Sequence, residues 1–215
     1  ISGKEFKIKS KVIVNASGSW VDEITGDKKS KLSADKLLLS VGIKPNVEDL
    51  GLEALNIEME KGFIKTNEVM KTSENDIYAI GDVTDGPWLA HKASHEGILC
   101  VDAIKGLKTH KIKKENIPGC TYSRPQIASI GLTEKKALEL NYEIKVGRFP
   151  FIGNGKAIAL GESEGFIKTI FDKKTGEFLG AHLVGPEVTE LIQGFAIAKK
   201  LETTEEDLME TIFPH

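Results

Sequence analysis

A carboxylate followed at once by a turn and a helix start is the feature of this chain best suited to chemistry. The apolar run Ile77–Ile80 ends in Gly81-Asp82, and a turn containing Pro87 opens onto a helix-like segment, Leu89–Lys105. A carboxylate placed there can accept hydrogen bonds from sugar or ribityl hydroxyls, and the free N–H groups of the first helical turn can face a carbonyl or phosphate oxygen. This order predicts a site for a large hydroxylated cofactor at the carboxyl ends of strands, where open α/β sheets bind ligands.

Strand candidates and one long helix must position that carboxylate. The apolar run Lys36–Val41 suits a buried strand. The helix expected over Leu89–Lys105 carries apolar side chains at helical spacing that end with Val101 and Ile104, and Gly106 is suited to terminate it. Further strands are expected at 6–8, 12–15, 62–67 and 72–82, with a short turn of helix at 48–55.

The second half of the chain has a different pattern. A charged stretch over 108–118 ends in Pro118-Gly119 and predicts a domain boundary. Beyond it, the pattern is typical of an antiparallel sheet with helices on one face, an α+β layer, with a hairpin turn at 172–177. Strands are expected at 121–122, 127–130, 142–150, 166–171 and 178–184, and helices at 133–140, 188–200 and 204–211.

Composition excludes several function classes. With 40% hydrophobic and 28% charged residues, the 215-residue chain is ordinary for a globular protein. A net charge of −3 gives no electrostatic case for nucleic acid or an anionic membrane, and the basic run 108–114 is short enough for a solvated loop. No apolar run reaches the length of a membrane span, and no signal peptide opens the sequence. We expect a cytoplasmic protein, or one of the mitochondrial matrix in a eukaryote.

The spacing of the two cysteines favours structural thiols over a redox or metal centre. Cys100 and Cys120 lie twenty residues apart, which fits no CxxC motif. Both are expected to be reduced thiols in a reducing compartment, and no metal site is expected. Because Ile1 is not a methionine and the chain ends at His215 without a cap or polar tail, we expect the sequence to be a fragment.

Five motifs occur in order: GIKPN at 42–46, TSENDIYAIGD at 72–82, GPWLAHKASHEG at 86–97, RPQIASIGLTE at 124–134 and FPH at 213–215. Together they resemble the C-terminal half of the dihydrolipoamide dehydrogenases, which are flavoprotein disulfide reductases. The resemblance covers about residues 31–215, and LAHKA followed by EG separates this family from the glutathione and mercuric reductases.

The resemblance implies an α/β plus α+β architecture. An incomplete FAD- and NAD-binding Rossmann-like portion would be followed by a dimerisation domain built from an antiparallel sheet and helices. The implied domains are a nucleotide-binding remnant at 1–70, the C-terminal part of the FAD-binding domain at 71–116 and the dimerisation domain at 117–215.

The resemblance also implies cofactor contacts around the Gly81-Asp82 turn. Asp82 would bond the ribityl chain of FAD, and the helix dipole would stabilise negative charge on the reduced flavin. Gly42 matches a glycine that lies near NAD in the family, although Ile43 stands where Arg or Lys is frequent. The helix start under the flavin ring would be formed by Trp88, Leu89, Ala90 and His91, with Trp88 in a position where Met is often found.

His215 matches the catalytic base of the family. In a homodimer it would work at the flavin–disulfide site of the other subunit and take a proton from a dihydrolipoamide thiol. An imidazole suits this task because its pKa lies near neutrality. The parent reaction converts dihydrolipoamide and NAD+ to lipoamide and NADH, and the parent enzyme works with the acyltransferase core of a 2-oxo acid dehydrogenase complex.

Parts of the family's machinery are not found in the sequence. No GxGxxG opens a βαβ unit for FAD or NAD, and no Cys-x4-Cys supplies a redox disulfide. We therefore expect the fragment to be inactive alone. Two other readings remain, namely a non-catalytic dimerisation or interaction module over 117–215, and a part of another flavin disulfide reductase.

The first thirty residues do not resemble the family's pyridine-nucleotide domain. The segment VIVNASGSW at 12–20 is most similar to the FAD-dependent glycerol-3-phosphate dehydrogenases, which have a related Asn-Ala-x-Gly-x-Trp. An unrelated origin for residues 1–30 is one interpretation. The other is an ordinary strand and loop with a surface Trp20.

Overall fold

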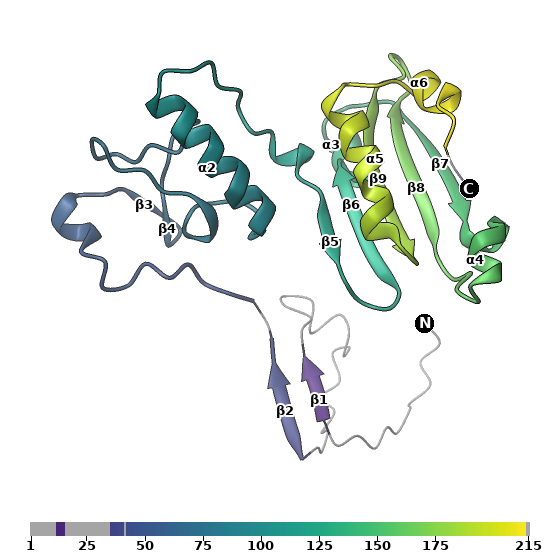
Figure 1. The fold of residues 1–215 in the computed structure, drawn as a ribbon, viewed down its shortest axis with the longest axis horizontal. Coiled ribbons are helices and arrows are strands. Elements are labelled where there is room, and N and C mark those ends of the chain that lie inside the picture. The colour runs from purple at the N-terminus through teal and green to yellow at the C-terminus, as the bar shows by residue number, and fades with distance from the viewer. Residues whose placement is uncertain (1–11, 16–34, 41, 214–215) are drawn as a thin grey trace.

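The computed structural model describes residues 12–15, 35–40 and 42–213, which form a small α/β part and a larger antiparallel domain (Figure 1). The strand expected at 6–8 lies outside the described residues. In the first part, β1 and β2 pair in parallel, with Val12 opposite Lys36. Its elements are β1 (Val12–Asn15), β2 (Lys36–Leu39), the 3-10 helix η2 (Leu52–Leu55), β3 (Met59–Glu60), β4 (Phe63–Ile64), the 3-10 helix η3 (Gly81–Val83) and α2 (Ala90–Ile104).

Two strand predictions in the first part were wrong in detail. Residues 72–82 do not form a strand, because Tyr78 makes one isolated antiparallel bridge, with Lys71, and no continuous ladder. The run at 36–41 does form a strand over Lys36–Leu39, but Leu38 is 55% exposed and is not in a buried core. The core of this part is a small cluster in which Ile57, Ile64 and Ala79 are buried.

Helix α2 begins and ends one residue inside the expected range. Lys105 is the C-cap and Gly106 follows with φ 69°, so that the Gly106 and Leu107 N–H groups donate to the carbonyls of Ala103 and Asp102. This pair of hydrogen bonds is a Schellman ending, for which glycine is favoured because it has no Cβ.

The buried face of α2 differs from the expected one. Val101 is 58% exposed and Ile104 57% exposed, whereas four other residues are buried. These are Lys92, Glu96, Leu99 and Cys100. The helix therefore places two charged residues on its buried side.

The second part contains a five-stranded sheet in the order β5-β6-β9-β8-β7, in which every neighbouring pair is antiparallel. Its central strand β9 pairs with β6 and β8, and β5 and β7 are the outer strands. The Asp172–Glu177 turn joins β8 to β9, which confirms the expected hairpin. The strands are β5 (Gly119–Thr121), β6 (Gln126–Gly131), β7 (Ile144–Pro150), β8 (Phe166–Asp172) and β9 (Phe178–Gly185).

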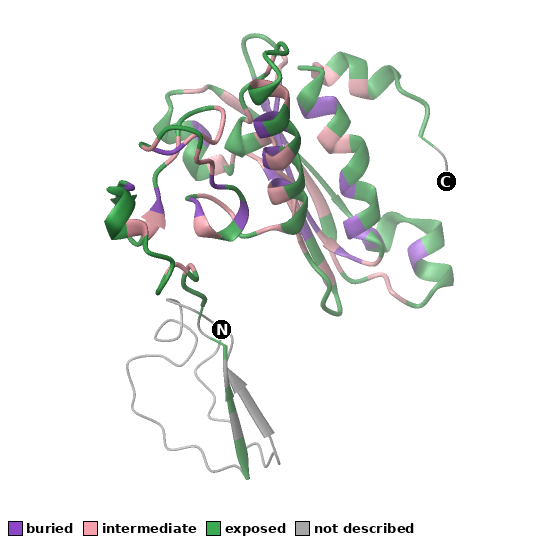
Figure 2. Cartoon of the chain, turned by 60° about the vertical axis from the view of Figure 1, so that its left-hand side comes forward, coloured by how far each residue is buried: buried purple, intermediate pink, exposed green. Residues whose placement is uncertain are grey.

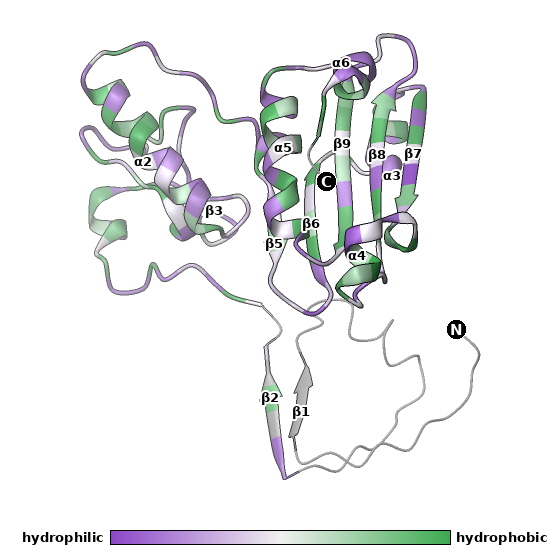
Figure 3. Cartoon of the chain, turned by 45° about the vertical axis from the view of Figure 1, so that its right-hand side comes forward, coloured by the Kyte–Doolittle hydropathy of each residue, from purple (hydrophilic) through white to green (hydrophobic). Residues whose placement is uncertain are grey.

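Four α-helices accompany the sheet, and they are α3 (Glu134–Glu139), α4 (Gly155–Ala159), α5 (Val188–Lys200) and α6 (Glu205–Glu210). Helix α5 has the expected bounds and covers one face of the sheet (Figure 1), whereas Ala137 of α3 packs with Ile170 and Leu179 in a separate cluster. Phe178 and Leu183 of β9 pack against Val188 and Ile192 of α5 in the largest core cluster. Figure 2 colours buried residues purple on α5 and on the strands of the sheet, and Figure 3 shows hydrophobic green alternating with hydrophilic purple along α5.

Helix α4 was not expected, because Asn154-Gly155-Lys156 has the composition of a turn. Its N-terminus is stabilised by the Asn154 side chain, which accepts a hydrogen bond from the Ala157 N–H at 2.9 Å. Thr133 and Thr204 cap α3 and α6 in the same way, as expected from their positions. Of the helices in the described part of the chain, none combines the length and apolar character needed to cross a membrane.

Candidate functional site

The Gly81–Val83 turn presents the Asp82 carboxylate. Gly81 is buried and adopts φ +76°, and a Cβ added to it would lie 3.3 Å from the Ala93 Cβ on α2. Glycine therefore allows both the left-handed backbone and the close contact between η3 and α2. Asp82 itself is exposed, and among the described residues its side chain has no hydrogen-bond or ion-pair partner.

The start of α2 offers free backbone donors. Leu89 is the N-cap in an extended conformation and supplies no side-chain cap, so the N–H groups of the first turn have no side-chain acceptor. Trp88, 38% exposed, packs its ring 5.8 Å from that of Phe63 on β4. The helix dipole adds positive potential at this end.

The donors and acceptors of this site can be compared with the groups of a flavin nucleotide. The site has a carboxylate without a partner among the described residues and an uncapped helix N-terminus, held side by side by the η3–α2 contact. A carboxylate accepts hydroxyl hydrogen bonds, and amide groups donate to carbonyl or phosphate oxygens. The chemistry of this donor and acceptor set fits one wall of a flavin site.

Two residues that the sequence reasoning missed lie directly beneath the turn. Lys92 and Glu96 form a buried ion pair at 2.9 Å, with side chains 3% and 6% exposed. Glu96 accepts a hydrogen bond from the Gly81 N–H at 2.7 Å, and Lys92 donates to the Gly81 carbonyl at 3.2 Å and to Thr84 Oγ1 at 3.1 Å. Lys92, Glu96 and Leu99 occupy positions i, i+4 and i+7, so they share one face of the helix. This spacing from an apolar residue was the sequence signal that could have placed the two charged residues on the buried face.

His91 connects α2 to the second part of the chain. Its Nε2 lies 2.8 Å from the Pro118 carbonyl oxygen, to which it donates in the tautomer that carries the proton on that nitrogen. The resemblance placed His91 in the helix start, and the structure adds this contact of its ring. A cavity of about 750 Å³ lies between α2 and α5 beside this bond, lined in part by His95, Cys120 and Ile192.

The remaining expected site residues are not joined to this cluster. Gly42 is exposed, with φ +129° and no atom within 4 Å of an added Cβ, in the segment that follows β2. His215 lies outside the described residues. The structure therefore brings the turn that contains Asp82 against the first turns of α2, through Gly81 and Ala93, and it shows no such contact for Gly42.

The cysteines are not activated nucleophiles. Burial raises the pKa of the Cys100 thiol, and burial followed by the charge of Glu190 raises that of Cys120. Each thiol therefore carries little thiolate at neutral pH.

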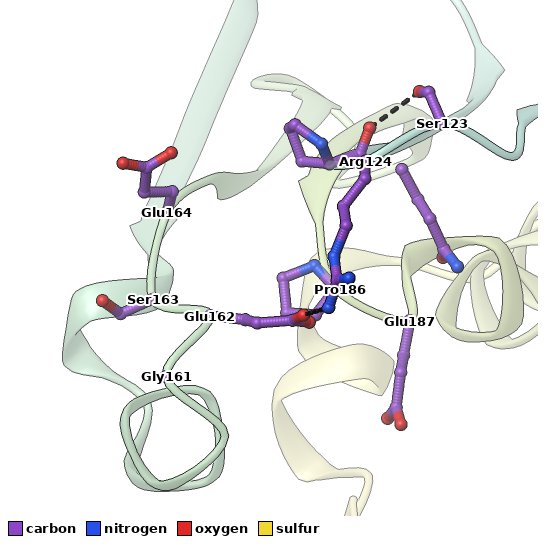
Figure 4. Close-up of a pocket in the computed structure, with 10 residues that line it drawn as sticks. Ser123, Arg124, Gly161, Glu162, Ser163, Glu164, Pro186 and Glu187 are labelled. Atoms are coloured by element: carbon purple, nitrogen blue, oxygen red, sulfur yellow. Dashed lines mark hydrogen bonds and ion pairs between the residues drawn. The ribbon is translucent and has the colours of Figure 1, made fainter.

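A second cavity lies in the antiparallel domain, away from the Asp82 turn. It measures about 620 Å³ and is an open pocket bordered by the segment before β6, the segment before β8 and the turn after β9 (Figure 4). Arg124 and Glu162 form an exposed ion pair across it, and Ser123 Oγ donates to the Pro125 carbonyl at 2.7 Å. None of the expected site residues lines this cavity.

Sequence models of one known family match both parts of the chain. A sequence model described as pyridine nucleotide-disulphide oxidoreductase matches residues 2–97, and one described as the dimerisation domain of the same family matches residues 117–215. The chain belongs to the pyridine nucleotide-disulphide oxidoreductase family, which confirms the resemblance and the fold class. The match over 2–97 includes residues 12–20 and gives no support to a separate origin for residues 1–30.

Curated relatives are named dihydrolipoyl dehydrogenase. The Rhizobium etli protein is 57% identical over 194 residues, covering 90% of this chain and 40% of its own length. The Bacillus subtilis protein is 46% identical over 85% of this chain and 39% of its own length, and the mitochondrial protein of Pisum sativum is 37% identical over 99% and 44%. The chain thus spans about two fifths of the length of these relatives. Dihydrolipoyl dehydrogenases use FAD and NAD.

Solved structures of flavoprotein disulfide reductases share the fold. LpdA of Mycobacterium tuberculosis aligns with a TM-score of 0.80 at 26% identity, over 86% of this chain and 40% of that one. The HOCl-induced flavoprotein disulfide reductase RclA of Escherichia coli aligns with a TM-score of 0.80 at 25% identity, over 87% of this chain and 44% of that one.

Proposed function

We propose that this chain is the C-terminal part of a dihydrolipoyl dehydrogenase and that its 81–91 segment forms one wall of the FAD site. The observation that carries the proposal is the juxtaposition of the exposed Asp82 carboxylate with the uncapped start of α2, across the contact between Gly81 and Ala93. The names of the curated relatives support the same assignment.

In this proposal each residue acts through binding and orientation. Asp82 would accept hydrogen bonds from ribityl hydroxyls, and the amides of Ala90 and His91, with the helix dipole behind them, would donate to oxygen atoms of the flavin. Trp88 and Leu89 would complete the part of the site formed by the helix start. When bound, FAD supplies the two-electron chemistry between the dithiol and NAD.

The catalytic base is assigned to His215 and the NAD-proximal position to Gly42. His215 would remove the proton from a dihydrolipoamide thiol at the site of a partner subunit, so a homodimer is required. We propose the domain division 1–70, 71–116 and 117–215 and docking of the dimer on the acyltransferase core of a 2-oxo acid dehydrogenase complex. Because the two cysteines are not spaced as Cys-x4-Cys, we expect the 215-residue chain alone to oxidise no dihydrolipoamide.

Equilibrium dialysis of the chain against FAD, followed by flavin absorbance, tests the flavin site. Asp82→Asn should weaken binding about 10- to 100-fold, because a hydrogen bond to a charged group contributes about 1.5–3 kcal/mol. Asp85→Asn is the matched control, since Asp85 lies on the same loop but is paired with Lys114 at 2.6 Å. Equal affinity of the Asp82 variant and the unmodified chain would refute the assignment of Asp82.

A dimerisation module without bound flavin is the second candidate function. The largest core cluster is built entirely from residues after 117, which gives this domain a core of its own. Sedimentation equilibrium of flavin-free protein tests this function. A colourless dimer supports it, whereas a colourless monomer contradicts it.

A further inference from the structure

The buried Lys92–Glu96 pair stands out because two formal charges lie on the inner side of α2. Their side chains are 3% and 6% exposed, and Lys92 Nζ lies 2.9 Å from Glu96 Oε1. Lysine and glutamate are among the residues least often fully buried, and then only when paired. All three donors of the ammonium have partners, namely Glu96, the Gly81 carbonyl and Thr84 Oγ1.

The partners of the pair converge on one short segment. Glu96 Oε2 accepts from the Gly81 N–H at 2.7 Å, so the two side chains hold both backbone polar groups of Gly81. The Thr84 hydroxyl accepts from Lys92 and donates to the Gly81 carbonyl at 2.8 Å. The residues fixed in this way flank Asp82 on both sides.

The aliphatic stem of Lys92 also supports the next part of the loop. Gly86 adopts φ +129°, and a Cβ added to it would lie 3.0 Å from Lys92 Cε. The loop from Gly81 to Gly86 therefore rests along one side chain of α2. Lys92 lies in the first turn of that helix, so it links the carboxylate turn to the helix start.

Net stability is a poor explanation for such a pair. Replacing a buried ion pair by apolar residues of similar volume is often neutral or stabilising, whereas the fixed direction of its hydrogen bonds is lost. We propose that Lys92 and Glu96 are positioning residues that hold the Asp82 turn in register with the α2 N-terminus for a flavin nucleotide. This inference rests on the proposed function for its ligand, but its geometric part can be tested without any flavin.

The first test measures amide hydrogen exchange in the 215-residue chain. Lys92→Met combined with Glu96→Leu removes the hydrogen bonds while keeping the volume of the side chains. We expect this variant to unfold within about 5 °C of the unmodified chain, while the Gly81 amide exchanges at least about tenfold faster. The matched control is Lys44→Met with Glu48→Leu, an i,i+4 pair at 2.6 Å whose side chains are 75% and 69% exposed.

Glu96→Gln provides the conservative variant, because an amide oxygen can still accept from the Gly81 N–H. It should retain most of the protection that the double variant loses. Unchanged exchange of the Gly81 amide in the double variant would overturn the proposal, whatever the chain does with flavin.

The second test repeats the FAD dialysis with the same variants. The double variant should bind FAD at least about tenfold more weakly, with Glu96→Gln closer to the unmodified chain. Faster exchange with unchanged FAD affinity would overturn the positioning role. If the unmodified chain binds no FAD, both the proposed flavin site of this fragment and the positioning role of the pair are refuted. The exchange result still decides separately whether Lys92 and Glu96 hold the Gly81 turn in place.

Discussion

Replacing Phe178 by alanine should destabilise the antiparallel domain while leaving the stability of the α2 part largely unaffected. Phe178 is fully buried in the largest core cluster, and its ring lies 5.7 Å from that of Phe171 and 5.8 Å from that of Phe195. Phenylalanine-to-alanine substitutions in cores cost about 3–5 kcal/mol. The two aromatic contacts place this one toward the upper end of that range.

The effect is large for a domain of this size. At about 4–8 °C of Tm for each kcal/mol in a domain of 60–100 residues, a loss of about 4–5 kcal/mol should lower the melting temperature by about 15–40 °C. Typical free energies of unfolding for a domain are about 5–15 kcal/mol, so the variant keeps only part of its free energy of unfolding. Phe166→Ala is the matched control in the same sheet, because Phe166 is 40% exposed and leaves a smaller cavity.

The chain provides a separate probe for each part. Both tryptophans, Trp20 and Trp88, precede residue 117, so tryptophan fluorescence follows the first part during urea unfolding. Far-UV circular dichroism follows the sheet, which contributes most of the strand content. We expect the dichroism midpoint of Phe178→Ala to fall while the fluorescence midpoint stays within error. Equal shifts of both midpoints would show that the two clusters unfold as one unit and would refute the reasoning.

Three further outcomes are expected. Gly131→Ala should destabilise the chain by about 2–5 kcal/mol in urea unfolding, because Gly131 has φ +78° and its new Cβ would lie 2.2 Å from the Leu179 carbonyl oxygen. The Lys174 N–H, with a smaller contribution from a neighbouring hydroxyl, holds the pKa of Asp172 below its usual range. The stability that Asp172 contributes is therefore present above the unfolded pKa of about 3.9 and is lost as the pH falls through the folded pKa. In thermal melts, Asp172→Asn should reduce the fall of the melting temperature with decreasing pH in this acidic range. Cys100 should react with a disulfide reagent at least about tenfold more slowly in the folded chain than in urea, since burial raises its pKa, and equal rates would contradict its burial.

Local patterns carried most of the fold prediction. The amphipathic spacing over Val188–Lys200 located α5 to the residue, and Thr133 indicated the start of α3 because its hydroxyl can accept the Lys136 N–H. Gly106 marked the end of α2 for an equally local reason, its left-handed backbone. Such signals depend on neighbours in sequence, so they can be read without the tertiary structure.

The failures concern contacts between distant segments. Val101 and Ile104 were expected to lie on the inner face of α2, but the helix is rotated so that Lys92 and Glu96 face the Gly81 turn. Hydrophobic periodicity cannot indicate this, because it assigns charged residues to solvent. The strand expected before Asp82 failed similarly, since a strand needs a partner ladder and its own residues do not specify one.

The candidate site was predicted in part. The Gly81-Asp82 turn and the start of α2 lie in contact as the order of residues indicated. The bond between the His91 ring and Pro118 could not be predicted, because it joins residues 27 positions apart whose approach depends on how α2 meets the second part of the chain.

The outer strands of the five-stranded sheet have a consequence for self-association. On β7, Lys145 and Arg148 form ion pairs at 2.8 Å with Glu205 and Glu134, and Pro150 offers no N–H to a further strand. The opposite outer strand, β5, is only three residues long. Charged, proline-bearing or very short edges resist strand addition and aggregation. A second copy must therefore meet this domain through its side-chain surfaces and not by extending the sheet, which favours a closed assembly over open-ended fibres.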